Sequence, residues 1–354
     1  MEVPCVAVAR EAGELARTAL AEAGVLDDDH EIAVDDGVIY IPVTDADAAA
    51  DAVADVDGDT EITTHDLAVR QGVQTPADFL GFDPSLERIG DIVVIDEDNP
   101  DRAKSIADAV IESGLPVRSV LNRASKIKGE LRVREWEVVA VDSSATAEGT
   151  DVAAADSDRS PTETVHREYG HEFLVDIAAV YFSPRLATER HRVVEGVEPG
   201  ERLLDMFAGV GPFAIPAASR GAEVVAVDLN ETAVDYCREN AHRNGVADAV
   251  STICADVCEV DDDYRGWADR LVMNLPHSAN EFLDTAVALA GDDCIIHYYD
   301  IQHEDDPFGP GIEAIRAAAE PTYDVRVETE HVVRSYAPHE LNICLDVRLS
   351  KTEQ

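Results

Sequence analysis

The fold of this chain is decided by the stretch Leu203–Ala218, which reads LLDMFAGVGPFAIPAA. A short apolar run ends in Asp205, turns on Gly209 and Gly211, and enters a helix of small residues. That order is typical of the first strand, loop and helix of a doubly wound sheet, where glycines let the backbone approach a ligand. Pro212 removes a backbone N–H at the helix start that a pyrophosphate would use. The stretch therefore favours a ligand without a pyrophosphate, although a Gly-x-Gly loop alone is weak evidence of binding.

Polar residues end the strands that follow. The run Val224–Val227 leads into Asp228, at the distance from the glycines where an acid binds the two hydroxyls of a ribose. Asp256 follows the next predicted strand and suits an adenine amino group, and Asn274 ends the one after it, where a transferred group would meet its acceptor. Each side chain alone could be a strand-end cap. Together they predict an S-adenosylmethionine site at the carboxyl edge of the sheet.

The charge of the chain is unusually negative, with a net charge of −45 and only four lysines among 28 basic residues. This composition is typical of proteins from salt-adapted, halophilic organisms. In molar salt the Debye length is about 3 Å, so the total charge says little about what a local site binds. The chain has no run of eighteen apolar residues and no signal-peptide pattern, so we expect a cytoplasmic protein, a monomer, without membrane association.

The six cysteines are scattered along the chain. Cys254 and Cys258 are close enough to suggest half of a metal site, but no histidine or second cysteine pair has ligand spacing. We therefore expect buried free thiols and no metal.

The pattern of the chain predicts four segments. Residues 1–58 read as a small α+β domain containing a hairpin, and residues 59–74 show little periodicity and are expected to be a linker. Residues 75–165 are expected to form a second, basic α+β domain packed on the last one. Residues 166–354 alternate strands and helices, which predicts a Rossmann-like α/β sheet of seven strands that ends in a hairpin.

The second segment contains the only basic stretch of the chain, with one acid, Glu130, among its cations. An ordinary solvated face is the alternative explanation. In so acidic a chain we interpret the stretch as a contact for a polyanion. Its cations are Arg118, Arg123, Lys126, Lys128, Arg132 and Arg134.

Three segments together resemble the archaeal and eukaryotic tRNA (guanine(37)-N1)-methyltransferase family. They are VYFSPRLATER at residues 180–190, DMFAGVGPF at 205–213 and Asn-Leu-Pro at 274–276. The last is related to a motif of methyltransferases that act on planar nitrogen, in which an aromatic residue stands where this chain has His277. The resemblance covers essentially the whole chain. It implies methyl transfer from S-adenosylmethionine to N1 of guanosine 37 beside the anticodon, which maintains the reading frame, and a leading domain that touches the outer corner of the tRNA.

The resemblance also implies roles for charged residues. N1 of guanine carries a proton that must be removed, and a glutamate at the position of Glu189 takes it, while an arginine at the position of Arg132 stabilises the charge on O6. Arg134 is the rival for the second role. The structural alternatives are a salt bridge from Glu189 to Arg185 or Arg192, and a phosphate contact for Arg132.

The remaining expected contacts follow from the same resemblance. Arg190 is expected to pair with the carboxylate of the cofactor, and Tyr181 and Arg185 to contact the flipped-out base or its phosphates. Asn274 is expected to hold the edge of the nucleobase. The cofactor crevice is expected to comprise Asp205, Phe207, Gly209, Gly211, Asp228, Leu229, Asp256, Val257, Asn274 and Pro276.

Two other functions stay open. A sister family transfers the aminocarboxypropyl group of the same cofactor to this tRNA position during wyosine synthesis. It lacks the Pro-Arg-Leu, Gly-Pro-Phe and Asn-Leu-Pro segments that are present here, which favours methyl transfer. A non-catalytic protein that binds the cofactor or RNA is the second alternative.

Overall fold

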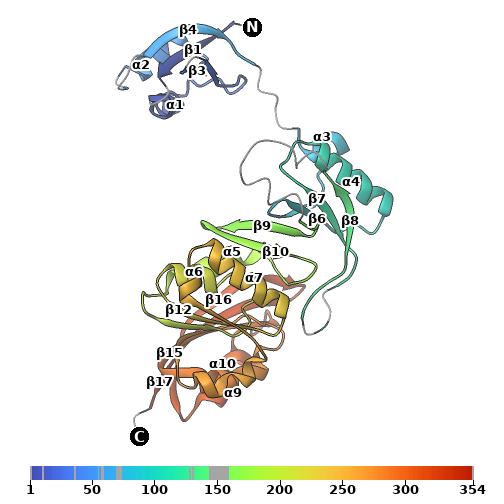
Figure 1. Cartoon of the computed structure of the whole chain (residues 1–354), viewed down its shortest axis with the longest axis vertical. Helices are drawn as coiled ribbons and strands as arrows, with labels where there is room; N and C mark the ends of the chain where they lie inside the picture. Colours follow the sequence, from blue (N-terminus) through green and yellow to red (C-terminus); the bar gives the residue numbers. More distant parts are fainter. Residues whose placement is uncertain are drawn as a thin grey trace. The chain divides into compact units, whose positions relative to one another are not determined.

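The structure is a computed structural model that forms two compact units, Met1–Thr75 and Pro76–Gln354 (Figure 1). No helix in the described part of the chain combines the length and the apolar character needed to span a bilayer. The structure describes residues 2–9, 12–35, 37–54, 56, 60–68, 74–126, 129, 131–142 and 159–352.

The first unit is a four-stranded sheet in the order β2-β3-β1-β4 with two helices. The helices are α1 (Gly13–Glu22) and α2 (Ala46–Ala52), and α2 begins where the side chain of Asp45 accepts two backbone N–H groups. Leu20 and Ile41 lie in the core between helices and sheet. The strands are β1 (Glu2–Ala9), β2 (Ala33–Asp35), β3 (Val38–Pro42) and β4 (Thr60–Asp66).

The prediction of a linker from residue 59 is wrong for Thr60–Asp66. This segment is strand β4, which pairs antiparallel with β1 from Thr60 opposite Val8 to Asp66 opposite Glu2. It is an edge strand whose side chains are half-buried or exposed, so it lacks the apolar alternation of a strand with one buried face.

The second unit begins with a sheet in the order β5-β6-β7-β8. Strands β6 and β7 are parallel, and α4 (Pro100–Glu112) connects them after a cap at Asn99. A two-stranded hairpin of β9 (Glu163–Glu168) and β10 (His171–Asp176) follows. The other elements are α3 (Pro76–Leu80), β5 (Glu87–Ile89), β6 (Ile92–Ile95), β7 (Ser119–Arg123) and β8 (Trp136–Val141).

The largest sheet has seven strands in the order β13-β12-β11-β14-β15-β17-β16, and β17 runs antiparallel to both of its neighbours. The predicted number of strands and the closing hairpin are confirmed. The strands are β11 (Arg202–Asp205), β12 (Glu223–Asp228), β13 (Val250–Cys254), β14 (Ala268–Met273), β15 (Ala290–His303), β16 (Tyr323–Ala337) and β17 (Glu340–Lys351).

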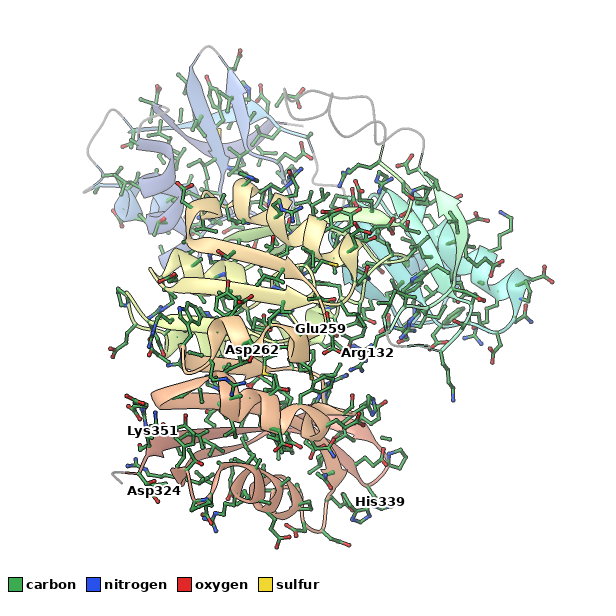
Figure 2. The ribbon with its side chains drawn as sticks, turned by 60° about the horizontal axis from the view of Figure 1, so that its bottom comes forward. Arg132, Glu259, Asp262, Asp324, His339 and Lys351 are labelled. Atoms are coloured by element: carbon green, nitrogen blue, oxygen red, sulfur yellow. The ribbon has the colours of Figure 1, made fainter. Side chains whose placement is uncertain are left out.

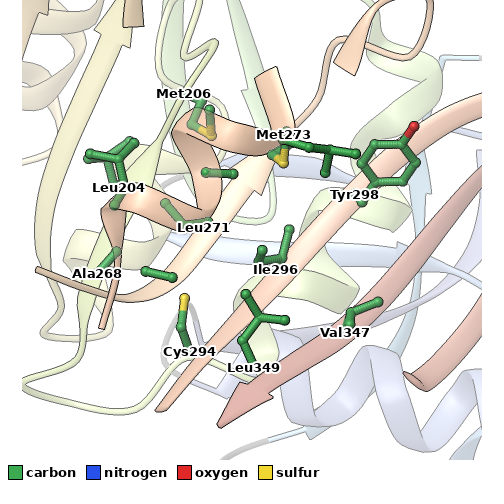
Figure 3. Close-up of a cluster of buried hydrophobic side chains, with 14 of the residues drawn as sticks. Leu204, Met206, Ala268, Leu271, Met273, Cys294, Ile296, Tyr298, Val347 and Leu349 are labelled. Atoms are coloured by element: carbon green, nitrogen blue, oxygen red, sulfur yellow. The ribbon is translucent and has the colours of Figure 1, made fainter. Parts of the chain in front are cut away.

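Helices cover both faces of this sheet because alternate residues of its strands point to opposite faces. Leu203 packs with residues of α5, α6 and α7, whereas the next residue, Leu204, packs with α9 and α10. Figure 3 shows the second cluster, with Leu271 of β14 and Ile296 of β15 at its centre. The helices are α5 (Ala187–Glu195), α6 (Ala214–Ser219), α7 (Glu231–Arg243), α8 (Asp261–Tyr264), α9 (Leu283–Leu289) and α10 (Gly309–Ala319).

Two turns precede the sheet. Strand β10 ends at Asp176, whose carbonyl oxygen accepts the N–H groups of Ala179 and Val180 in a turn. A 3₁₀ turn, Pro184–Leu186, leads directly into α5.

The β5–β8 sheet is fixed to the seven-stranded part of the same unit. Trp136 Nε1 donates to the carbonyl oxygen of Ile177 at 2.9 Å. Leu121 of β7 and Val210 of the glycine loop belong to one buried cluster. These two contacts therefore hold the β5–β8 sheet against the part of the unit that contains the glycine loop.

Candidate active site

The glycine loop follows β11 and has a shape that only glycine adopts easily. Gly209 has φ +54° and Gly211 has φ +90°. A Cβ atom on Gly211 would lie 2.9 Å from the Sγ atom of Cys237 on α7. The N–H of Gly209 donates to Asp228 Oδ2 at 2.7 Å, which joins the ends of β11 and β12. Backbone and carboxylates thus meet at one point of the sheet edge.

Asp205 and Asp228 are buried acids at that point. Asp205 is 1% exposed, and its Oδ2 atom has no hydrogen-bond partner among the residues that the structure describes. Burial raises its pKa to about 7, and the nearby charge of Asp228 adds to the shift. Burial also raises the pKa of Asp228, although the N–H groups of Asn230 and Gly209 oppose this shift. An unpaired buried acceptor indicates a place for a ligand or water that donates a hydrogen bond.

The other expected cofactor residues surround this edge in different ways. Leu229 is 50% exposed beside Asp228, as an apolar wall for a ring would be. Phe207 is partly buried and packs edge-to-face on Phe282. The side chain of Val257 is in the core, so this residue offers a ligand only its backbone.

Asp256 follows β13, and Asn274 follows β14, the neighbour of β11. Asp256 is exposed and accepts the N–H of Cys258 at 2.9 Å, so the strand-end cap considered from the sequence is present. Asn274 follows β14 and is half-buried. Pro276, two residues on, lines a pocket described below.

The smaller sheet brings Arg132 to the same edge (Figure 2). The central guanidinium carbon of Arg132 lies over the ring of Tyr181, 5.2 Å from its centroid. The carbonyl oxygen of Tyr181 is in turn 4.0 Å from the Cβ position of Gly209. Burial and the charge of Arg132 lower the pKa of His277, which follows the Asn-Leu-Pro segment. Arg132 thus stands between the glycine loop and Asn-Leu-Pro.

Arg132 lies in a turn and not on a strand. Arg132 has φ +54° in a turn where its N–H donates to Gly129, and β8 begins only at Trp136. The rival, Arg134, lies over the ring of Trp136, 5.4 Å from its centroid. Burial lowers the pKa of Arg134, and the charge of Arg123 adds to this shift. Of the two arginines, Arg132 is the one stacked on Tyr181.

Glu189 lies in the first turn of α5 and is 5% exposed. Arg192 binds both of its carboxylate oxygens, each at 2.8 Å, so the salt bridge considered as an alternative is present, with Arg192 and not with Arg185. The hydroxyl of Tyr299 donates to Oε1 at 2.9 Å, and Nε2 of His331 lies 3.3 Å from Oε2. Tyr299 follows Tyr298, the β15 partner of Met273, and so lies level with Asn274.

Arg190 already has a protein partner. Its Nε and Nη2 atoms donate to the two carboxylate oxygens of Glu168 at 2.9 and 2.5 Å, and Nη2 also donates to the carbonyl oxygen of Ser183. Glu168 was not singled out in the sequence, because an acid in a hairpin carries no signal of a partner 22 residues away. The expected pairing of Arg190 with a cofactor carboxylate stays a prediction.

Part of the predicted RNA contact is wrong. Arg118 is 9% exposed and donates to the carbonyl oxygens of Ser160 and Glu163, so it anchors β9 and cannot face RNA. A guanidinium carries five N–H donors and no acceptor, so it can bind several carbonyl oxygens at once, which explains this structural role.

Two other arginines pair with one acid. Arg123 bonds to Glu87 and Asp96, and Arg185 donates to both carboxylate oxygens of Glu87, at 3.0 and 3.1 Å. Both remain partly exposed at the side chain. Lys126 is exposed, and Lys128 lies outside the described residues.

A pocket of about 420 Å³ lies beside the Asn-Leu-Pro segment, between the ends of β15, α10 and the β16–β17 hairpin. The hydroxyl of Tyr336 lies 3.1 Å from Nε2 of His277, and their rings meet edge to face. Tyr336 therefore supplies an aromatic ring at the place where the motif of this chain lacks one. The sequence did not single out Tyr336, because it lies on β16, 59 residues from His277 in the chain. The lining includes Pro276, His277, Tyr298, Asp300, Gln302 and Tyr336.

One buried cluster, His297, Cys344 and Asp346, has atoms spaced as in a metal site. Arg270 lies 2.7 Å from the Nε2 atom of His297, and Arg192 lies 2.6 Å from Asp346 Oδ2. Two guanidinium groups occupy the positions a cation would need, so the cluster is an ion-pair network.

The prediction that all cysteines are buried is wrong for Cys254 and Cys258, which are exposed. Both lie near the end of β13, at the border of the sheet.

The strand order, the antiparallel β17 and the acids at the ends of β11 and β12 define a class I methyltransferase of the S-adenosylmethionine-dependent kind. The TRM5/TYW2 methyltransferase domain matches residues 164–328, and the tRNA methyltransferase 5 N-terminal domain matches residues 5–51. The chain is 38% identical over 344 residues to the tRNA (guanine(37)-N(1))-methyltransferase Trm5b of Pyrococcus abyssi, which covers 96% of each chain. The chain belongs to this Trm5 family.

A solved complex of aTrm5 and tRNALeu has the same fold, with a TM-score of 0.67, 28% identity and coverage of 98% of this chain and 99% of that one. The sister family is more distant. The tRNA(Phe) (4-demethylwyosine(37)-C(7)) aminocarboxypropyltransferase of Pyrococcus horikoshii is 32% identical over 75% of this chain and 89% of its own. A structure of M. jannaschii TYW2 with AdoMet has a TM-score of 0.56 and 25% identity, and covers 76% of this chain and all of that one.

Proposed function

We propose that this protein transfers the methyl group of S-adenosylmethionine to N1 of guanosine 37 in tRNA. The observation that carries the proposal is the similarity to Trm5b along 96% of both chains, together with the match of residues 5–51 to the tRNA methyltransferase 5 N-terminal domain. The aminocarboxypropyl transferase match covers 75% of this chain. The stack of Arg132 on Tyr181 beside the glycine loop supports the proposal, because we assign both residues to the acceptor side.

The residues at the strand ends are suited to the donor. S-adenosylmethionine, when bound, supplies an electrophilic methyl group on a sulfonium. Asp228 binds the ribose hydroxyls, and Leu229 packs against the adenine ring. The loop at Gly209 and Gly211 leaves room for the donor to contact the backbone. The unpaired Oδ2 atom of Asp205 accepts a hydrogen bond from this ligand or its water.

The acceptor side carries the proton chemistry. Glu189 takes the N1 proton of guanine, Arg132 stabilises the negative charge that grows on O6, and Asn274 holds the edge of the base. The pocket beside Pro276 and Tyr336 accommodates part of the displaced nucleotide.

The tRNA contacts we propose use the exposed Lys126 and the half-buried Tyr181 and Arg134 near this edge, with Arg123 and Arg185 beside Glu87. The unit Met1–Thr75 touches the outer corner of the tRNA. We further propose a monomeric cytoplasmic enzyme adapted to high salt, with a domain boundary near residue 165 inside the second unit.

Incubation with labelled cofactor and tRNA transcripts carrying G or A at position 37 tests the proposal in molar salt. We expect label only in the G transcript, and the modified nucleoside should carry one added methyl group on N1. An added aminocarboxypropyl group would instead identify the sister activity, and tRNA binding without turnover would identify a non-catalytic protein.

A further inference from the structure

All the hydrogen-bonding positions of the Glu189 carboxylate are occupied by described residues in this structure. It accepts four contacts, two from Arg192, one from Tyr299 and one from His331. A carboxylate offers about four lone-pair directions. A base that is to accept the N1 proton of guanine must therefore first lose one of these partners.

His331 is the partner that leaves most easily. Arg192 is fixed from the far side by Asp346, at 2.6 Å, and Tyr299 is 1% exposed within the core. The imidazole of His331 stands on β16, the edge strand of the sheet, with 40% of its side chain exposed and the longest of the four contacts.

His331 is also the only partner of Glu189 among the described residues that can accept a proton and pass it to water. A guanidinium has no acceptor atom. The hydroxyl of Tyr299 has no route to solvent, and burial raises its pKa well above the ordinary value. An imidazole can take a proton at one ring nitrogen and release one from the other, and that of His331 touches both Glu189 and solvent.

The charged and titratable groups around this pair come from three elements. Arg192 faces Glu189 from α5 and Tyr299 faces it from β15. Cys344 of β17 pairs with His331 in the strand register, and Asp346 stands behind Arg192. Arg192 and Asp346 offset each other, which leaves the Glu189 carboxylate as the partner of the imidazole.

We propose that His331 restores Glu189 after each methyl transfer by carrying the N1 proton to solvent; this rests on the proposed function. Guanine displaces His331, and the N1–H proton passes to Oε2 of Glu189. The N1 electron pair forms the bond to the methyl group, and the electron pair of the broken S–C bond stays on sulfur. While it is displaced into water, His331 exchanges to the tautomer with its proton on Nδ1. The neutral methylated base leaves, His331 returns, and its unprotonated Nε2 atom takes the proton from Oε2 while Nδ1 releases its own proton to water, which restores the Nε2–H that donates to Glu189.

The test separates the first turnover from later ones in His331→Ala. We expect the first turnover at close to the wild-type rate and later turnovers at least ~10-fold slower. Added imidazole should restore the later turnovers in a saturable way. His191→Ala is the matched control, since His191 is also 40% exposed at the side chain but pairs with Glu195; it should change neither phase.

Three results would overturn the inference. They are unchanged later turnovers, a slow first turnover that imidazole does not restore, and an equal effect of His191→Ala. Thermal melting and cofactor affinity of each variant report whether it is folded. If the wild-type protein itself methylates no G37, the proposed function fails, and that result is distinct from all three.

Discussion

Arg132 lies over the ring of Tyr181, with 5.2 Å between its guanidinium carbon and the ring centroid. Both residues lie in connecting segments of different parts of the unit, since Arg132 precedes β8 and Tyr181 follows β10. Because the carbonyl of Tyr181 borders Gly209, this contact joins the smaller sheet to the cofactor loop.

Arg132→Ala should lower the single-turnover rate on tRNA about 10²-fold, because losing one donor to a developing oxyanion costs about 3 kcal/mol. Rapid quench with labelled cofactor measures the rate, and filter binding measures tRNA affinity, which should change little. Arg134→Ala, on the ring of Trp136, is the control. A larger loss of rate in the control would transfer the O6 role to Arg134.

Glu189→Gln should leave cofactor affinity nearly intact and lower the single-turnover rate by ~10² or more, because an amide cannot take the N1 proton. The variant also loses the charge that faces Arg192, so its melting temperature must be recorded beside the rate. A folded variant that turns over normally would rule out Glu189 as the base.

Gly211→Ala should destabilise the protein and weaken cofactor binding. The substitution places a Cβ 2.9 Å from Cys237 at φ +90°, and overpacking of this kind costs about 1–3 kcal/mol beyond the backbone strain. Gly200→Ala is the matched control, because Gly200 has φ +84° with open space around its Cβ position. Equal losses of stability in the two variants would show that the loop tolerates a side chain.

Asp205→Asn should change how stability depends on pH in the cofactor-free protein. The folded pKa of Asp205 is about 7, above the ordinary value near ~3.9 that it has when unfolded. The folded state thus holds more protons between these values, and stability is lost as pH rises through that window. The amide has no such loss, so at pH ~8 the variant should be more stable by on the order of 2–4 kcal/mol.

Chemical denaturation of both proteins at pH ~4 and pH ~8 measures this difference. An advantage of the amide that is the same at both pH values would mean that Asp205 stays ionised throughout.

Arg118→Ala should lower the melting temperature, because the carbonyl oxygens of Ser160 and Glu163 lose their donor, and should leave tRNA affinity of the folded protein unchanged. Lys126→Ala should leave the melting temperature unchanged and weaken tRNA binding. It should also reduce the slope of log affinity against log salt by about 0.7–0.9, the value for one phosphate contact. An unchanged slope would remove Lys126 from the interface.

The larger sheet could be predicted because its strands are apolar runs that end in acids. Leu203–Asp205 and Val224–Asp228 are such runs, and the structure confirms both strands. Strand β4 could not, because Thr60–Asp66 is an edge strand of polar and half-buried residues whose partner is β1.

The candidate site was predicted in part for a similar reason. Residues such as Gly209 and Asp228 are local features of a strand end, which the sequence reveals directly. Partners distant in the chain are not local. Arg185 pairs with Glu87, 98 residues away, and Arg118 donates to the carbonyl oxygen of Ser160 before β9. The sequence therefore could not show which charged residues have structural partners and which are exposed.

The bond from Trp136 to the carbonyl oxygen of Ile177 is one of several polar links between the β5–β8 sheet and the rest of the second unit. Arg118 donates to the carbonyl oxygen of Glu163, and Arg185 donates to Glu87. Because these links are numerous, the smaller sheet cannot shift without disturbing the residues beside the glycine loop.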